Sequence, residues 1–259
     1  MKIYFFVFII LLNTGKLVAM SCSDIFTYNS VYETVQRLGG EGARFYPREP
    51  SNALITFLNT SGLNPGLAVI LGSGEGRNID PLVERHWQIV GVDSAEAGIR
   101  RAELDHKDNP TVSLYTANVL EPLDRVVAPG SADLVIGIQL VHMFIRAEDR
   151  LALFQNVWRL LRPGGFAFFE TNGEFEAGSI RYLNLDSPVE SRTLHRADGS
   201  TMKMDIPRFP TVMLNGETLR SEIERSGLIV ESMRGGSFRH PDTTRPQILA
   251  IVRKPDRPR

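Results

Sequence analysis

Short apolar runs alternate with segments of helical periodicity along residues 67–169, and this alternation limits the possible folds more than any other feature of the chain. Five runs have the length of buried strands, at residues 67–71, 88–92, 112–115, 133–138 and 166–169. Strands that alternate with helices indicate a parallel sheet with helices on both faces. The sequence therefore predicts an α/β fold.

The segment between the fourth and fifth strands has one apolar helical face. Its apolar residues recur at spacings of three and four, at Leu151, Phe154, Val157, Trp158 and Leu161. An Arg-Pro-Gly-Gly turn at residues 162–165 then leads into the fifth strand. Residues 24–66, which precede the first strand, are predicted to be mainly helical. The helical pattern is interrupted at residues 45–47, and a short helix is predicted from Asn52 to Leu58.

Residues 172–213 interrupt the alternation. Within them, Asp198-Gly199 separates two strand-like runs, 192–197 and 200–205. An Asp-Gly pair between such runs favours a hairpin, because both turn positions tolerate positive φ. We interpret the whole segment as an insertion over the carboxyl edge of the sheet, where it would act as a substrate lid.

The chain after the insertion completes the sheet. Residues 216–226 predict a helix, and two strand-like runs follow at residues 228–233 and 247–252. We place a reversed turn between these runs, around Gly235–Gly236 and Pro241, which makes the last pair antiparallel. The prediction is a seven-stranded, mostly parallel sheet with an antiparallel final pair and a β-hairpin insertion after the fifth strand.

A glycine-rich loop, Gly72-Ser73-Gly74-Glu75-Gly76, follows the first predicted strand. Glycines in such a loop let a ligand approach the backbone, because a Cβ would block it. Asp93 lies 17 residues past Gly76, at the end of the second strand. In sheets of this type, an acidic residue at that place bonds ribose hydroxyls. The pair of features predicts a site for a ribose-containing cofactor.

Nicotinamide-binding loops have the spacing G-x-G-x-x-G, in which the last glycine allows tight packing of helix against strand. Arg77 occupies that last position in this chain, and it is too bulky for the role. A nicotinamide-dependent oxidoreductase is therefore the disfavoured alternative at this point.

Five segments of the chain resemble class I S-adenosylmethionine-dependent methyltransferases. They are residues 69–76, 90–93, 117–119, 133–136 and 160–165. They have the order and spacing of that family over about residues 66–253, and the resemblance implies a Rossmann-like sheet. The stretch Gly74–Asn78, preceded by Pro47–Pro50, also has a faint similarity to the tellurite-resistance and thiopurine branch.

The resemblance implies that S-adenosylmethionine is the cofactor and assigns residues to it. The loop residues Gly72, Ser73, Gly74 and Gly76 would bring the backbone close to its methionyl part. Asp93 would accept hydrogen bonds from both ribose hydroxyls.

Four further residues would meet the cofactor, also by resemblance. Ser94 would lie beside the adenine, and Asn118 and Val119 would contact the adenine edge. Members of the family often have Asp where this chain has Asn118, but an amide oxygen also accepts from the adenine amino group. Gln139, after the fourth strand, would lie near the methionyl group.

Methyl transfer needs few special residues. The sulfonium is already activated, so alignment of nucleophile, methyl and sulfur does much of the work, and a base is required only when the acceptor must lose a proton. His142 is the candidate catalytic base, with ordinary packing as the alternative reading. We expect an unidentified small-molecule acceptor. A protein of the same fold that binds the cofactor without turnover is the second alternative.

The composition limits the classes of ligand and binding partner that the chain can have. The 259 residues have a formal net charge of −1, which argues against a nucleic-acid binder, since such proteins show a basic excess or stripe. The single cysteine, Cys22, excludes an intramolecular disulfide and a cysteine-based zinc site, and we expect no metal.

The first 23 residues form a signal-like or anchor segment. Lys2 precedes ten apolar residues, 3–12, which is half of the ~20 that a membrane helix needs and fits the apolar part of a secretory signal. Residues 19–22 loosely resemble a lipoprotein cleavage box. If translation starts at Met20, residues 24–259 form a cytoplasmic methyltransferase domain, which is the interpretation we favour. Membrane anchoring through residues 3–12 and export are the alternatives.

Overall fold

The computed structural model describes residues 21–40, 43–185, 190–196, 198–206, 209–240 and 243–256. The signal-like run at residues 3–12 lies outside these ranges. Within them, no helix combines the length and the apolar character needed to cross a membrane.

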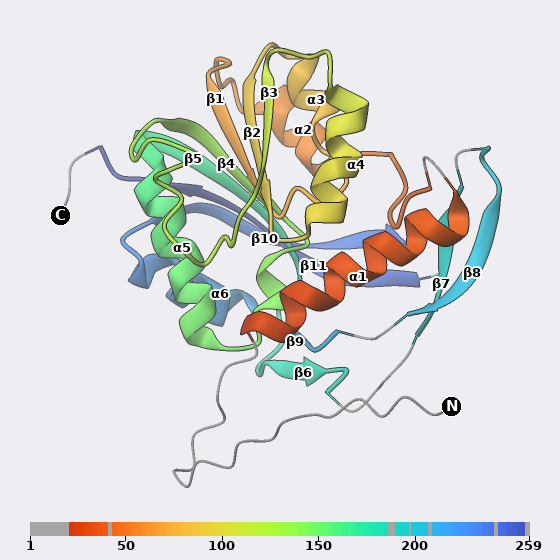
Figure 1. The fold of residues 1–259 in the computed structure, drawn as a ribbon. Helices are drawn as coiled ribbons and strands as arrows, with labels where there is room; N and C mark the ends of the chain where they lie inside the picture. The colour runs from red at the N-terminus through yellow and green to blue at the C-terminus, as the bar shows by residue number, and fades with distance from the viewer. Residues whose placement is uncertain are drawn as a thin grey trace, which may run out of the picture.

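Seven strands form one central sheet (Figure 1). In chain order they are β1 (Leu67–Leu71), β2 (Gln88–Asp93), β3 (Val112–Thr116), β4 (Ala132–Ile138), β5 (Leu161–Asn172), β10 (Ile229–His240) and β11 (Thr243–Arg253). Their order across the sheet is β10-β11-β5-β4-β1-β2-β3. Strands β1 to β5 are all parallel to one another, and β11 is antiparallel to both β5 and β10. The predicted fold class is confirmed.

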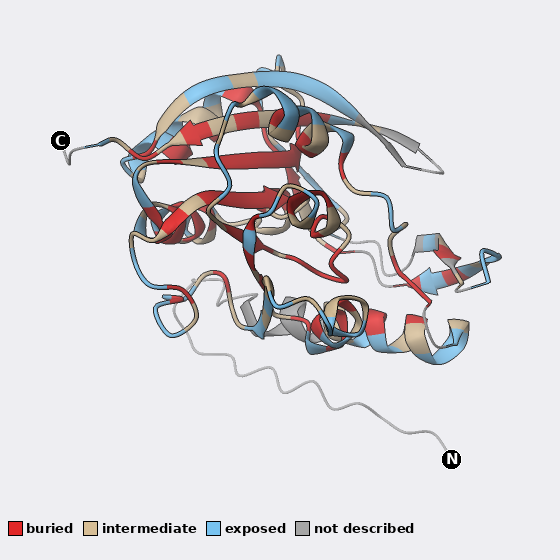
Figure 2. Cartoon of the chain, turned by 90° about the horizontal axis from the view of Figure 1, so that it is seen from above, coloured by how far each residue is buried: buried red, intermediate tan, exposed pale blue. Residues whose placement is uncertain are grey.

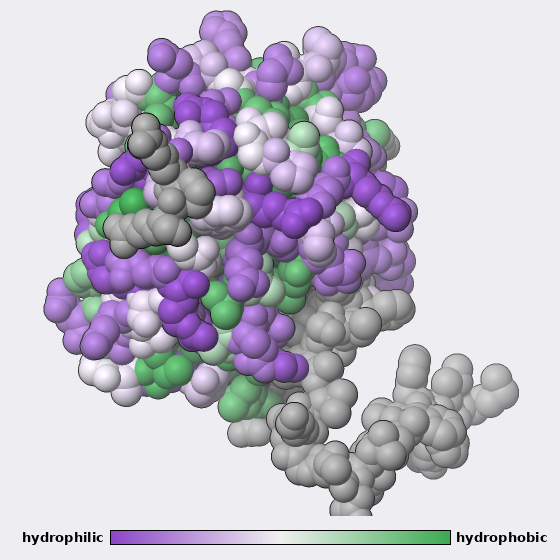
Figure 3. All heavy atoms as spheres, turned by 90° about the vertical axis from the view of Figure 1, so that its left-hand side faces the viewer, coloured by the Kyte–Doolittle hydropathy of each residue, from purple (hydrophilic) through white to green (hydrophobic). Residues whose placement is uncertain are grey.

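Helices cover both faces of this sheet. On one face, α5 (Ala147–Leu160) and α6 (Gly216–Arg225) contribute Phe154 and Ile223 to the larger hydrophobic core. On the other, α2 (Asn52–Thr60) and α3 (Asp80–Val83) contribute Phe57 and Leu82 to a second core. A further helix, α4 (Glu96–His106), packs against β2 and β3. Figure 2 shows the buried residues concentrated in the central strands, and in Figure 3 hydrophobic residues lie scattered among polar ones on one face.

The first helix and the insertion pack against each other. Helix α1 (Ser21–Gly39) supplies Val31 and Val35 to a small apolar cluster, which the insertion completes with Leu194, Met204 and Phe209. The insertion contains β6 (Arg181–Leu183), β7 (Glu190–His195), β8 (Thr201–Ile206) and β9 (Thr211–Met213). The predicted hairpin is confirmed, because β7 pairs antiparallel with β8 and Gly199 has a φ of +81°. The β6–β9 pair was not predicted.

Two predicted turns differ from the structure in part. The reversal was not placed correctly at Gly235 and Gly236, which lie inside β10, paired with Ile248 and Gln247. Pro241, the other part of that prediction, lies outside the described residues. The absence of a side chain at Gly235 makes room for Phe175, whose Cβ would lie 3.1 Å from an added Cβ. The Arg-Pro-Gly-Gly segment is counted within β5, but it bulges out of the ladder with β4: Leu161 pairs with Ala132 and Phe166 with Leu134, and Gly164 between them has a φ of +74°.

Candidate cofactor-binding site

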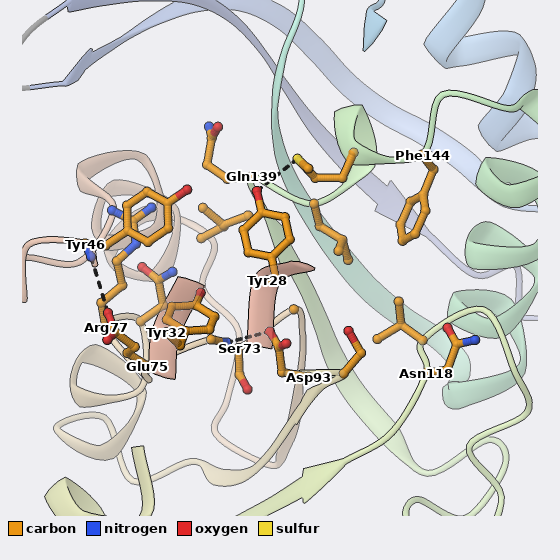
Figure 4. Close-up of a pocket in the computed structure, with 18 of the residues that line it drawn as sticks. Tyr28, Tyr32, Tyr46, Ser73, Glu75, Arg77, Asp93, Asn118, Gln139 and Phe144 are labelled. Atoms are coloured by element: carbon orange, nitrogen blue, oxygen red, sulfur yellow. Dashed lines mark hydrogen bonds between the residues drawn. The ribbon is translucent and has the colours of Figure 1, made fainter. Parts of the chain in front are cut away.

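One pocket opens at the carboxyl ends of β1, β2 and β4 (Figure 4). The loop after β1 forms one wall, and residues at the ends of β2 and β4 form the base. Side chains from α1 and from the segment before α5 complete the enclosure. This position is the crevice at which open parallel sheets bind ligands.

The loop after β1 requires glycine at two pocket-lining positions. Gly72 and Gly74 have φ values of +70° and +53°, which other residues adopt rarely. A Cβ on Gly74 would lie 2.9 Å from the Tyr32 hydroxyl, and a Cβ on Gly72 would lie 3.0 Å from Leu140. The backbone N–H groups of Gly72 and Ser73 both donate to the Val92 carbonyl, at 2.8 and 3.0 Å, which fastens the loop to β2.

Gly76 has a different position from the other loop glycines. Its φ is +83°, but it does not line the pocket. A Cβ there would lie 3.0 Å from the Ala102 Cβ and 3.1 Å from Ile79. The structure thus places Gly76 where the loop packs against α4, away from the expected contact with the methionyl group.

Asp93 lies at the end of β2 and lines the pocket. Its carboxylate accepts hydrogen bonds from the backbone N–H groups of Gly74 and Ala95, both at 2.8 Å. Loss of hydration raises the pKa of Asp93, and these backbone bonds act in the opposite direction. A carboxylate has about four acceptor sites, so Asp93 keeps capacity for the hydroxyls of a ligand.

Ser94, Asn118, Val119 and Gln139 also line the pocket. The Asn118 amide is held locally, because its oxygen accepts from Leu120 N at 3.0 Å and its nitrogen donates to Glu121 at 3.2 Å. Gln139 has a φ of +56°, and its backbone N–H donates to the Glu170 carbonyl at 2.7 Å. The side-chain atoms Nε2 of Gln139 and Oγ of Ser73 are buried with no hydrogen-bond partner among the described residues.

His142 does not line the pocket. Its side chain is buried, its backbone N–H donates to Thr171 Oγ1 at 3.0 Å, and its Nδ1 lies 3.3 Å from the same oxygen. The structure places it against Thr171 of β5.

Helix α1 contributes two side chains to the pocket that were not predicted from the sequence. Tyr28 and Tyr32 both line the pocket, and the Tyr28 hydroxyl donates to Met143 Sδ at 3.5 Å. Burial raises the pKa of Tyr32 well above its usual range, and the carboxylates of Asp93 and Glu75 add to the shift. The spacing of four residues, which puts both tyrosines on one face of a helix, was the available signal.

Glu75 was also missed, because it occupies a variable position of the glycine loop. Its carboxylate accepts from the backbone N–H of Phe45 at 2.9 Å and of Tyr46 at 3.3 Å. Arg44 donates to the Glu75 carbonyl at 3.0 Å and forms an ion pair with Asp105. Burial raises the pKa of Glu75 to about 7. These bonds fasten the segment before α2 to the glycine loop.

Comparison with known proteins finds a methyltransferase domain within the chain. Residues 68–165 match a family model described as a methyltransferase domain. A carboxy-S-adenosyl-L-methionine synthase from Shewanella sediminis is 29% identical over 129 residues, which are 48% of this chain and 47% of that protein. The tRNA (carboxymethyluridine(34)-5-O)-methyltransferase ALKBH8 of Macaca fascicularis is 28% identical over 145 residues, 54% of this chain and 20% of that protein. The chain thus spans less than half the length of these relatives.

Solved structures share the fold. The 1,6-didemethyltoxoflavin-N1-methyltransferase of Burkholderia thailandensis, with 1,6-didemethyltoxoflavin and S-adenosylhomocysteine bound, has a TM-score of 0.64. It is 14% identical, and the match covers 94% of each chain. A methyltransferase of Methanosarcina mazei has a TM-score of 0.59 at 12% identity, over 80% of this chain and 99% of that one. The matches give no support to the nicotinamide-dependent alternative: residues 68–165 match a methyltransferase domain, and the fold is that of S-adenosylmethionine-dependent methyltransferases.

Proposed function

We propose that this protein transfers a methyl group from S-adenosylmethionine to a small-molecule acceptor. The observation that carries the proposal is the position of Asp93 beside the glycine loop. Its carboxylate accepts from the Gly74 N–H at 2.8 Å, and both residues line the same pocket. Ribose and methionyl groups of one ligand would therefore meet the protein side by side.

The pocket fits this cofactor in two further respects. A Cβ on Gly74 would fill part of the space beside Tyr32, so the loop leaves room only because it has no side chain there. Two pocket-lining residues, Ser73 and Gln139, carry buried polar atoms without a partner among the described residues. Buried polar atoms in native proteins nearly always have a partner, and a bound cofactor would supply one.

Each part of the pocket has a role in this proposal. Gly72, Ser73, Gly74 and Gln139 would hold the methionyl part, and Asp93 would hold the ribose. Ser94, Asn118 and Val119 would surround the adenine. When bound, S-adenosylmethionine supplies an activated methyl group on its sulfonium, so the protein's main task is alignment.

The apolar residues around the pocket would exclude water from the transfer. Tyr28, Met143 and Phe144 line the pocket (Figure 4), and the insertion packs on α1 through the ring of Phe209, which stacks on Tyr28 at a centroid distance of 4.0 Å. We assign residues 172–213 the role of a lid on this basis. Any proton transfer by His142 would have to reach the pocket from its buried place beside Thr171.

A small-molecule acceptor agrees with the formal net charge of −1 and with the 1,6-didemethyltoxoflavin bound to the Burkholderia thailandensis neighbour. One relative acts on tRNA, so the test must include both classes. We would measure release of S-adenosylhomocysteine from S-adenosylmethionine over a panel of small heterocycles, amines and phenols, and over total tRNA. Turnover with a small molecule, absent in Asp93→Asn, is the expected result. Turnover with tRNA alone contradicts the acceptor class, and binding without any turnover favours the non-catalytic alternative.

A further inference from the structure

Arg150 and Glu222 form a buried ion pair that joins α5 to α6. Arg150 Nε donates to Glu222 Oε2 at 2.7 Å, and Nη2 donates to Oε1 at 2.6 Å. The two side chains are 2% and 7% exposed. Bidentate pairing fixes the geometry of both groups, and loss of either partner leaves a buried charge without compensation. The pair therefore holds the two helices in one relative position.

The same guanidinium also holds a wall of the pocket. Its Nη1 atom donates to the carbonyl of Phe144 at 2.7 Å and to the carbonyl of Ile145 at 3.0 Å. Both residues line the pocket, and Figure 4 shows Phe144 pointing inward on the side where Asn118 lies. These two carbonyls lie between the short 3₁₀ helix η1 (Val141–Met143) and α5, and the Phe144 N–H caps η1 by donating to the Val141 carbonyl at 3.2 Å. Arg150 therefore supplies a side-chain hydrogen bond to each of the two carbonyls that connect η1 to α5.

Glu222 connects this wall to the insertion. It lies on α6, the helix that directly follows the insertion and starts at the N-cap residue Asn215. The preceding strand, β9, contacts η1. Strand β9, at the end of the insertion, thus contacts η1 directly. Helix α6, which follows the insertion, is linked to Phe144 and Ile145 through Arg150.

We propose that Arg150 and Glu222 are positioning residues, which hold Phe144 and Ile145 in the geometry that binds the cofactor. This inference rests on the proposed cofactor site. It gives the pair a task beyond stability, since the guanidinium reaches α6 and the pocket wall at the same time.

Glu222→Gln tests the proposal, because it keeps the shape of the side chain and removes its charge. We expect the Kd for S-adenosylhomocysteine to rise about tenfold, which corresponds to ~1.4 kcal/mol, at a temperature well below the Tm of the variant. Hydrogen exchange of the unliganded variant should become faster at residues 144–149. Glu231→Gln is the matched control, because Glu231 forms an exposed ion pair with Arg253 on the outer strands, and it should change neither measurement.

A variant with a lower Tm but wild-type Kd and wild-type exchange at residues 144–149 would show that the pair is structural only. Failure of the wild-type protein to bind S-adenosylhomocysteine would contradict the proposed function instead. The exchange measurement would still test whether the Arg150–Glu222 pair holds Phe144 and Ile145 in place. Arg150→Lys is the second variant, for the case that Glu222→Gln does not fold. A lysine keeps the charge but cannot reproduce the forked contacts, so we expect changes in the same direction.

Discussion

At the scale of single residues, Gly74 and Asp93 carry the proposed cofactor site, and a local sequence pattern was sufficient to propose both residues, which the structure places in one pocket. A glycine loop after a strand and an acidic residue at the next strand end form a local pattern. Glu75 was not accessible in this way, because its role depends on the backbone of Phe45 and Tyr46, about thirty residues away in the chain. Contacts between distant segments leave no periodic signal in a sequence.

Gly74→Ala should weaken binding of S-adenosylhomocysteine at least ~10-fold, since the added Cβ lies 2.9 Å from the Tyr32 hydroxyl and the φ of +53° strains any side chain. Gly130→Ala is the control, because Gly130 has a similar φ of +72° and nothing within 4 Å of an added Cβ. Calorimetric titration of both variants separates backbone strain from occupation of the pocket. Equal loss of affinity in the two variants would show that Gly74 is only a turn residue.

Glu75 should make the protein less stable as the pH rises. Its pKa is raised from 4.5 to about 7 in the folded state, so the folded state holds this proton more strongly than the unfolded state. The free energy of unfolding then falls between these two pKa values and levels off above the higher one. Between pH 5 and pH 8 this contribution is about 2–3 kcal/mol. Urea unfolding should show that Glu75→Gln gains that amount relative to wild type over the same interval, and a pH-independent difference would contradict the assignment.

The elements were predictable where their patterns are local. Strand β1 has the predicted bounds, residues 67–71, because a short apolar run followed by glycine has few other readings. Strands β6 and β9 have three residues each, and β6 is exposed throughout, so neither carries an alternating pattern. The extra length of β10 comes from pairing with β11 through Gly235 and Gly236, which in a sequence indicate a turn.

His142 lies in η1, and its possible role as a catalytic base can be tested by substitution. If His142 acts as a base, His142→Ala should lower kcat by ~10²-fold or more with the affinity for S-adenosylhomocysteine preserved. If it only packs against Thr171, the variant should lose stability and keep kcat. Steady-state kinetics with the acceptor from the screen, together with thermal unfolding, decides between the two. His142→Gln, which keeps a hydrogen-bonding group, separates loss of the base from loss of the buried bond.

At the scale of the whole molecule, α1 and the insertion close over the carboxyl edge of the sheet (Figure 1). Tyr28 and Tyr32 come from α1, and the apolar cluster under the hairpin depends on Val31 and Val35. The sequence indicated an insertion over this edge, but it did not indicate that the N-terminal helix completes the pocket, because no motif lies in that helix.

Truncation tests this arrangement. A chain that begins at Met20 retains all of α1 and should bind S-adenosylhomocysteine as the full chain does. A chain that begins at Gly40 loses both tyrosines and exposes the cluster under the hairpin, so it should bind at least ~10-fold more weakly. Titration and thermal unfolding of the two truncated proteins provide the comparison. Equal affinity in both would contradict a role for α1 in the pocket.

Calorimetric titration of the wild-type protein and Asp93→Ala with S-adenosylhomocysteine tests the central claim most directly. The variant loses charge-assisted hydrogen bonds to the ribose, so we expect binding to weaken by about 2–4 kcal/mol, ~30-fold or more, with an unchanged circular dichroism spectrum. Asp124→Asn, at an exposed aspartate paired with Arg159, should bind as wild type does. Equal affinity of wild type and Asp93→Ala would contradict the assignment of the pocket as a cofactor site.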